Sequence, residues 1–258
     1  MAQKFFVVSD VHGFYDELIS ALNDAGFDKN NKDHWLVSCG DEWDRGSKPL
    51  EVMKFFINLE RKILVRGNHM GLFEELCQRS YPEWHDKSNG TVDTVLKIGE
   101  YKIDHEFDLC CERALKRTAR YRKLLVNYFE TENYIFVHSW IALNKIGIDK
   151  YEYRIDWRNA TDSDWENAMW VNGINMALDG LNKTGKTIVM GHYHCSYGHL
   201  CSSDGEISEF GKDAIWEPWY HKDCIAIDRC TAHTGKVNVI VIEDEFDENW
   251  LKKYGDKI

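Results

Sequence analysis

Short runs of β-branched and aromatic residues, bounded by Gly, Asp or Asn, recur along the chain and are typical of strands. Seven runs fit this description: 4–9, 34–38, 62–65, 134–138, 187–190, 223–228 and 236–242. Between the first three runs, apolar residues recur at helical spacing, which predicts helices over 15–25 and 49–59. Pro49 fits the second helix, because proline is favoured in a first helical turn. This β-α-β-α-β order predicts parallel strands joined by crossover helices.

The pattern changes after the third run. The stretch 70–132 is rich in charged and aromatic residues and predicts a helical, cap-like insertion over the strand ends, with a helix at about 112–126. The segment 149–172 carries tryptophans among acidic residues and predicts a loop-rich rim. The last two runs flank Thr234 and Gly235 and predict a hairpin at an edge or in a second sheet. With 258 residues, we expect one α/β domain over 1–258 that contains this insertion.

Composition narrows the classes of function. An apolar share of 43% with only 3 prolines favours a compact globule, and a net charge of −11 disfavours general nucleic-acid binding. The charge leaves a phosphorylated substrate possible, since a bound metal brings positive charge. We expect no signal peptide and no membrane span. Eight cysteines without C-x2-C spacing therefore predict reduced thiols in a cytoplasmic protein, with neither a structural zinc site nor a disulfide.

Five short segments carry metal-binding types of side chain at or just after predicted strands. They are Asp10-Val11-His12, Gly40-Asp41-Glu42-Trp43-Asp44-Arg45-Gly46, Gly67-Asn68-His69, His138 and Gly191-His192-Tyr193-His194. Asp, His and Asn side chains suit first-row divalent metals, and strand ends are where open α/β sheets build their sites. Asp41 could offer one carboxylate oxygen to each of two ions. Two such ions can clamp the attacking and leaving oxygens of an in-line displacement.

These motifs resemble those of the calcineurin-like metallophosphoesterases: D-x-H, G-D-x-x-D-R-G, G-N-H, a lone His after a strand, and G-H-x-H. The complete Gly-Asp-x-x-Asp-Arg-Gly run is similar to the corresponding motif of the phosphoprotein phosphatase branch. That branch also holds bacterial and phage protein phosphatases and symmetrical diadenosine tetraphosphatases. An Asn89-Gly90-x-x-x-Thr94 element and the closing segment from Ile225 extend the likeness over 4 to about 242. The resemblance implies a β-sandwich of two mixed sheets flanked by helices.

The resemblance also implies a role for each motif residue. Asp10, His12 and Asp41 would hold the first metal, and Asp41, Asn68, His138 and His192 would hold the second. Arg45 would grip the phosphoryl oxygens, and His69 would protonate the leaving oxygen with Asp44 orienting and charging its imidazole. The pairing of Asp44 with His69 also makes sense by itself, because a carboxylate keeps a neighbouring histidine protonated.

Three residues depart from the protein phosphatase pattern. Met70 stands where Glu normally follows G-N-H, and Asn172 stands where a second phosphate-binding Arg is expected. His194 completes a G-H-x-H pattern in which, across the wider superfamily, the second His binds the first metal. His194 is therefore either a ligand or a histidine beside the site.

We expect an enzyme that uses two divalent metal ions to hydrolyse phosphomonoesters in one step, similar to the serine/threonine phosphoprotein phosphatases. The alternative is a nucleotide polyphosphate hydrolase of the diadenosine tetraphosphate type, in which a tryptophan could serve as a stacking platform instead of packing in the core or rim. A non-catalytic binding protein on a phosphatase scaffold is the alternative of another class, and the intact ligand set argues against it. The resemblance favours manganese, with iron or zinc as alternatives. The partner would be a phosphorylated protein or a nucleotide, in a phage or bacterial cytosol.

Overall fold

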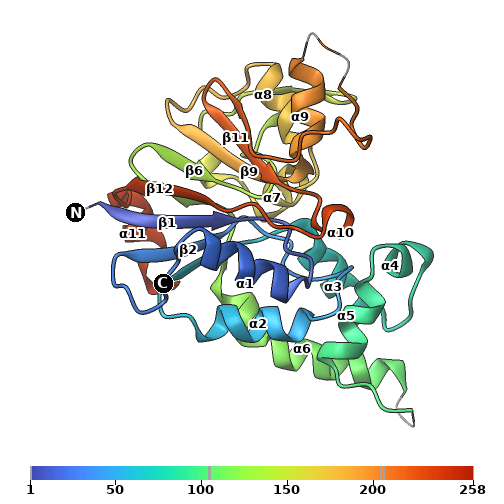
Figure 1. Cartoon of the computed structure of the whole chain (residues 1–258). Coiled ribbons are helices and arrows are strands. Elements are labelled where there is room, and N and C mark those ends of the chain that lie inside the picture. The colour runs from blue at the N-terminus through green and yellow to red at the C-terminus, as the bar shows by residue number, and fades with distance from the viewer. Residues whose placement is uncertain (1, 104–105, 204, 206, 258) are drawn as a thin grey trace.

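Two mixed sheets form the centre of the computed structural model, which describes residues 2–103, 106–203, 205 and 207–257 (Figure 1). The strands of the first sheet lie in the order β12 (Ile240–Asp244), β1 (Gln3–Val8), β2 (His34–Ser38), β3 (Lys62–Val65) and β4 (Leu125–Val126). Neighbours from β1 to β4 are parallel, and β12 is antiparallel to β1. The parallel strands therefore end at the same edge, which positions the loops that follow them.

The second sheet faces the first and is mixed as well. Its order is β10 (Trp219–His221), β11 (Cys224–Asp228), β9 (Thr187–His194), β6 (Tyr134–Phe136) and β5 (Phe129–Glu130). β9 is parallel to both β11 and β6, whereas the two outer pairs are antiparallel. A separate hairpin is formed by β7 (Asn144–Gly147) and β8 (Lys150–Glu152).

Successive side chains of β1 point to opposite faces of the first sheet and belong to two separate parts of the core. Phe5 and Val7 pack between the sheets, whereas Phe6 and Val8 face the helices on the other side of the first sheet. That helical layer contains α1 (Tyr15–Asp24), α2 (Pro49–Asn58), α3 (Asn68–Arg79), α4 (Trp84–Ser88), α5 (Thr91–Ile98) and α6 (Phe107–Leu124). All the side chains of β1 from Phe5 to Val8 are at most 1% exposed, as expected for a strand covered on both faces.

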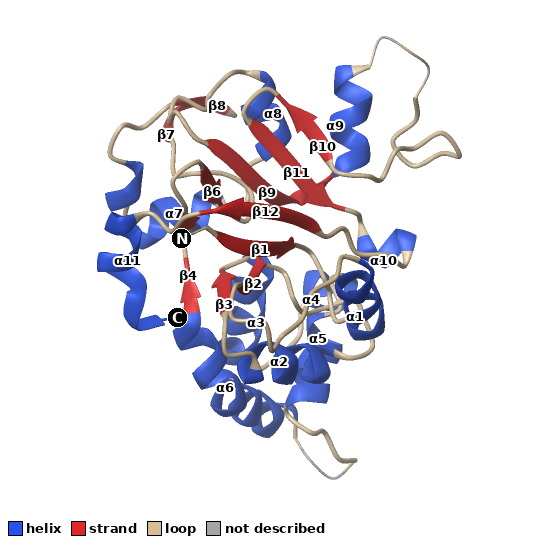
Figure 2. Cartoon of the chain, turned by 60° about the vertical axis from the view of Figure 1, so that its left-hand side comes forward, coloured by secondary structure: helices blue, strands red, loops and turns tan. Residues whose placement is uncertain are grey.

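The remaining helices are η1 (Trp157–Asn159), α7 (Asp162–Ala168), α8 (Gly173–Leu178), α9 (Cys195–Ser202), α10 (Thr231–Thr234), α11 (Glu248–Tyr254) and η2 (Gly255–Lys257). Figure 2 shows α8 and α9 beside the second sheet. α8 contacts β9, and α9 contacts β9, β10 and β11. The expected α/β architecture of two mixed sheets flanked by helices is confirmed. None of the helices in the described part of the chain is long and apolar enough to cross a bilayer.

The closing hairpin was a wrong prediction. β11 and β12 belong to different sheets, and β12 pairs with β1 at the opposite end of the sequence. Gly235 caps the short helix α10 with φ +63°, so it ends a helix instead of turning a hairpin. The turn signal at Thr234 and Gly235 marked the end of one element, but it carried no information about which strand β12 pairs with.

The stretch 70–132 is helical only as far as Leu124, after which β4 and β5 each join one of the sheets. Its helices pack on the outer face of the first sheet, with Phe73, Val95 and Tyr121 in that core. The reading of this stretch as an insertion in a single domain over 1–258 stays a prediction.

Candidate metal centre

Backbone hydrogen bonds join the loops after β1 and β2. The Asp10 nitrogen donates to the Gly40 carbonyl at 3.0 Å, and the His12 nitrogen donates to the Asp41 carbonyl at 2.9 Å. The Gly46 nitrogen returns a bond to the His12 carbonyl at 2.7 Å. These bonds fix the two loops side by side, so motifs thirty residues apart in sequence enter one site.

Gly40 permits a third loop to approach. Its φ is +97°, and a Cβ built there would lie 2.7 Å from His138 Nδ1 and 2.8 Å from the Gly67 Cα. Only glycine combines this backbone conformation with such close packing. Gly40, the first residue of the G-D-x-x-D-R-G motif, therefore allows His138 and Gly67 to pack against this loop.

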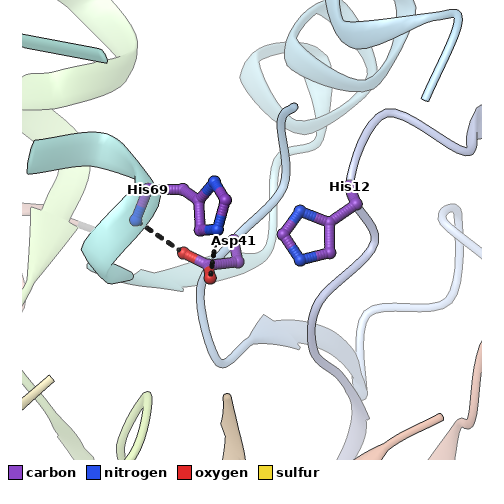
Figure 3. A group of neighbouring side chains, drawn as sticks. All are labelled: His12, Asp41 and His69. Atoms are coloured by element: carbon purple, nitrogen blue, oxygen red, sulfur yellow. Dashed lines mark hydrogen bonds and ion pairs between the residues drawn. The ribbon is translucent and has the colours of Figure 1, made fainter. Parts of the chain in front are cut away.

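Asp41 lies between two groups of ligand-type side chains. It groups with His12 and His69 on one side and with His138 and His192 on the other, and within each group the potential ligand atoms lie within 4.8 Å of one another. Figure 3 shows the first group, with both imidazoles beside the Asp41 carboxylate and His69 reaching it from the start of α3. A carboxylate common to both groups is the arrangement that two metal ions require.

The surroundings of His138 show whether the second group suits a cation. Its Nδ1 donates to the Cys39 carbonyl at 2.8 Å, which leaves a lone pair on Nε2 in the neutral imidazole. That Nε2 lies 2.7 Å from Asn68 Oδ1, 3.2 Å from His192 Nδ1 and 3.3 Å from Asp41 Oδ2. Four electron-rich atoms thus converge on a buried point, and a divalent cation fits this donor set.

The side chains around the first group are also held in place by hydrogen bonds through atoms that do not face the site. His12 Nδ1 donates to the Trp43 carbonyl at 2.8 Å, so its Nε2 is directed to the site, 3.9 Å from Asp10 Oδ1. The other oxygen of Asp10 accepts bonds from the His192 nitrogen at 2.9 Å and from the Ser9 hydroxyl. Such second bonds hold metal-binding side chains in place and are typical of metal sites.

The pKa values follow from burial and these contacts. Burial lowers the pKa of His138, but the Asp41 carboxylate outweighs it and raises the pKa to about 9. Burial and the nearby His138 lower the pKa of His192 to about 3, which leaves it neutral. Burial alone would raise the pKa of Asp41, yet the His138 and His69 imidazoles hold it well below its ordinary value. In the metal-free protein, a proton on His138 thus provides the positive charge that the site needs.

His69 is paired with a second carboxylate. Its Nδ1 lies 2.6 Å from Asp44 Oδ2, and the buried Thr91 hydroxyl donates to the same oxygen at 2.7 Å. The Asp44 nitrogen in turn donates to Thr94 Oγ1 at 3.1 Å. Burial opposes the charged imidazole, but Asp41 and Asp44 outweigh it and raise the pKa of His69. Sequence reasoning missed the role of Thr91, for which the neighbouring N-G-x-x-x-T element was the only signal.

Arg45 directs its guanidinium towards the two imidazoles of the first group. Nη1 lies 2.9 Å from His12 Nε2, and Nη2 lies 3.3 Å from His69 Nε2. These atoms border a cavity of about 150 Å³ that is lined by Asp10, His12, Asp41, Arg45, Asn68, His69, Leu72, Asn89, Trp170 and His192. A planar guanidinium beside such a cavity can bind two oxygens of one phosphoryl group.

The three atypical residues have separate explanations. Met70 is 5% exposed and belongs to the core beside the first sheet. Asn172 caps α8, because its Oδ1 accepts from the Asn175 nitrogen at 3.1 Å. His194 directs Nε2 to Glu209 Oε1 at 2.8 Å and does not belong to either ligand group among the described residues.

The structure therefore brings together nine of the ten predicted site residues, whereas His194 bonds to Glu209. Those brought together are Asp10, His12, Asp41, Asp44, Arg45, Asn68, His69, His138 and His192.

Comparison with known proteins points to one family. A family model described as calcineurin-like phosphoesterase matches residues 3–236. The asymmetrical bis(5'-nucleosyl)-tetraphosphatase PrpE of Bacillus velezensis is 39% identical over 72 residues, which are 24% of this chain and 29% of that protein. The symmetrical bis(5'-nucleosyl)-tetraphosphatase of Neisseria meningitidis serogroup A is 33% identical over 93 residues, or 36% of this chain and 32% of that protein. The matched segments thus span about a third of each of these curated relatives.

A solved structure shares the fold at low sequence identity. A cold-active protein tyrosine phosphatase superposes with a TM-score of 0.53 and 16% identity, over 97% of this chain and 80% of its own. At that identity the likeness concerns the fold alone.

Proposed function

Because the chain belongs to the calcineurin-like phosphoesterase family, we propose that this metal-dependent hydrolase cleaves nucleoside polyphosphates of the bis(5'-nucleosyl)-tetraphosphate type. The observation that carries the proposal is the pair of ligand groups sharing Asp41 beside Arg45. The names of the two relatives support a nucleotide substrate. The expectation of a phosphoprotein substrate has support only at the level of the family, so the alternative stated from the sequence becomes the main reading.

We assign the metal-binding roles as the motifs implied. Asp10, His12 and Asp41 would hold one divalent cation, and Asp41 with Asn68, His138 and His192 would hold the other. Two bound cations would draw charge from a phosphoryl group and make a water molecule more acidic. Manganese as the cation stays a prediction.

Arg45 and His69 supply the remaining chemistry. Arg45 binds oxygens of the phosphoryl group under attack, since both of its terminal nitrogens lie beside imidazoles of the first ligand group in the lining of the metal-site cavity. His69 donates a proton to the bridging oxygen that leaves with the departing nucleotide. Asp44 keeps that imidazole charged and fixes Nδ1, so Nε2 carries the transferable proton. The raised pKa of His69 suits a proton donor at neutral pH.

A parallel assay tests this proposal. The purified protein with Mn²⁺ is given diadenosine tetraphosphate and a phosphoserine peptide, with Asp41→Asn as the control for adventitious hydrolysis. We expect kcat/KM for the dinucleotide to exceed that for the peptide by at least about a hundredfold, a difference of roughly 2.7 kcal/mol. Product chromatography distinguishes release of two ADP from release of ATP and AMP. Turnover of the peptide alone would overturn the proposal, and activity retained by Asp41→Asn would overturn the catalytic reading.

A further inference from the structure

Trp170 is exposed where comparable tryptophans are buried. Its side chain, between α7 and α8, is 51% exposed, whereas Trp157, Trp165 and Trp219 are at most 3% exposed. An indole that stays half exposed loses part of the stabilisation that burial would give, so packing alone does not explain its position. The indole lines the metal-site cavity, with its ring centroid 6.3 Å from that of His192 and the planes at 84°.

Two further hollows adjoin the same indole. One has a volume of about 200 Å³ and is walled by Leu143, Tyr151, Asn167 and Val171 as well as Trp170, and we call it the Trp170 pocket. The other, of about 320 Å³, extends along α3, and we call it the acidic groove because Glu74, Glu75 and Glu166 line it. Trp170 is thus the wall shared by the metal-site cavity and both hollows.

Polarity separates the two hollows as sites for a nucleobase. In the acidic groove, Glu74 is paired with Arg66 at 2.6 Å and with Arg122 at 3.0 Å, and Glu75 is paired with Arg79 at 2.9 Å. Asn68, Gln78 and Glu166 add further polar side chains to the same lining. A base ring would therefore find little apolar surface to pack against along α3.

The Trp170 pocket offers a different surface. Two charged residues line it: Asp164, whose carboxylate is bound by Arg154 at 2.8 Å and accepts bonds from Thr161, and Lys145. Leu143 and Val171 provide apolar wall, and the Asn167 carboxamide carries both a donor and an acceptor. A flat, uncharged heteroaromatic ring matches this combination of an exposed indole, aliphatic walls and an amide.

Building on the proposed function, we propose that the Trp170 pocket is the subsite for a nucleobase of the substrate, with the base stacked on the Trp170 indole while its phosphates occupy the metal-site cavity. The position of Trp170, which lines both the metal-site cavity and the largely apolar Trp170 pocket, carries this inference. Stacking tolerates any base, because every base has a π-face. Trp170 then determines specificity for nucleotides over phosphates without an aromatic base and takes no part in the bond cleavage.

Binding measurements test the subsite independently of turnover. Isothermal titration calorimetry on the Mn²⁺-loaded protein compares AMP with ribose 5-phosphate, which lacks only the base. We expect AMP to bind about tenfold or more tightly, and we expect Trp170→Ala to bring the ratio of the two dissociation constants close to one. Trp170→Phe keeps an aromatic face and should retain most of the ratio. Trp84→Ala removes an indole that is 81% exposed on α4 and should leave the ratio at its original value.

The outcomes distinguish this inference from the proposed function. Equal affinity for AMP and ribose 5-phosphate in the original protein, or a ratio unchanged in Trp170→Ala, would overturn the subsite even if diadenosine tetraphosphate is cleaved. A ratio that depends on Trp170 in a protein that fails to cleave the dinucleotide would retain the subsite and reject the proposed function. Thermal unfolding of each variant confirms that a lost ratio does not come from a lost fold.

Discussion

Replacing Gly67 with alanine would place a methyl group against the Asp41 carboxylate. A Cβ built on Gly67 comes closer than 3.0 Å to the Oδ1, Cγ and backbone nitrogen of Asp41, and real Cβ atoms essentially never show such a contact. Asp41 is only 3% exposed, and its Oδ1 accepts a bond from the His69 nitrogen at 3.1 Å. Asp41 therefore has no open space into which it could move without losing contacts.

The expected loss has two parts. Overpacking at a closely packed position costs about 1–3 kcal/mol of unfolding free energy. For a chain of this size, each kcal/mol lowers the melting temperature by roughly 2–4 °C. Asp41 belongs to both ligand groups, so its displacement weakens both metal positions. We expect the apparent affinity for Mn²⁺ to fall by about 10- to 100-fold, as for other changes that misplace a metal ligand.

Gly71→Ala is the matched control, four residues along the same helix. A Cβ built there meets only Glu166 Oε1, at an ordinary 3.8 Å. Alanine in a helix interior is favoured over glycine by about 0.5–1 kcal/mol, so this variant should be slightly more stable. Thermal unfolding and dinucleotide hydrolysis are followed across a Mn²⁺ titration for both variants. If Gly67→Ala bound Mn²⁺ as tightly as Gly71→Ala, the close packing of this glycine on the carboxylate would not be what the motif provides.

Five further predictions concern charge and hydrogen bonding. Asp44→Asn removes a charge that raises the pKa of His69, so the alkaline limb of the kcat profile, where the proton donor is lost, should move to lower pH; an unmoved limb would exclude His69 as the donor. Thr91→Val removes one of the two hydrogen-bond donors to the buried Asp44 Oδ2, the other being His69, and should cost about 1–3 kcal/mol in urea unfolding, whereas Thr91→Ser should not. The pKa of His138 is raised to about 9 without metal, so metal binding at pH 7 should release a proton, measured by calorimetry in buffers of different ionisation enthalpy. The same raised pKa stabilises the metal-free fold fully below about pH 6.5, and this gain is lost as the pH rises through about 9, as melting temperatures against pH would show. His194→Ala should keep Mn²⁺ affinity within about twofold, because that imidazole bonds to a carboxylate outside both ligand groups.

Local patterns predicted those elements whose neighbours in space are also neighbours in sequence. The strands 34–38 and 62–65 have the predicted bounds, because each is a buried run between two crossover helices. β12 was misplaced because its partner, β1, lies at the other end of the chain, and no local signal reports that pairing. β4 and β5 are two residues long, too short to show any period, yet each joins a sheet.

The types of ligand in the site were predictable from the sequence, whereas the contacts and exposure of the residues around them were less so. Asp, His and Asn at strand ends identified the ligand types, because few other roles need all of them together. The bond from Thr91 to Asp44 depends on α5 packing against the loop after β2, and a lone threonine carries no sign of it. The exposure of Trp170 depends likewise on how the segment between α7 and α8 packs, since all the tryptophans near it looked alike in sequence.

The backbone conformation of the site explains why the loops that carry these motifs must be held together by contacts with one another. Non-glycine residues rarely adopt positive φ, and each such residue costs of order 1–3 kcal/mol unless its surroundings compensate. Of the eleven described non-glycine residues with positive φ, six belong to the site: Asp10, His12, Asp41, Asp44, Arg45 and His192. Strain concentrated in this way requires the bonds that join the loops after β1 and β2, together with the close approaches that Gly40 and Gly67 permit. The glycines of the motifs are therefore as necessary to the metal centre as its ligands, because they let the strained loops meet.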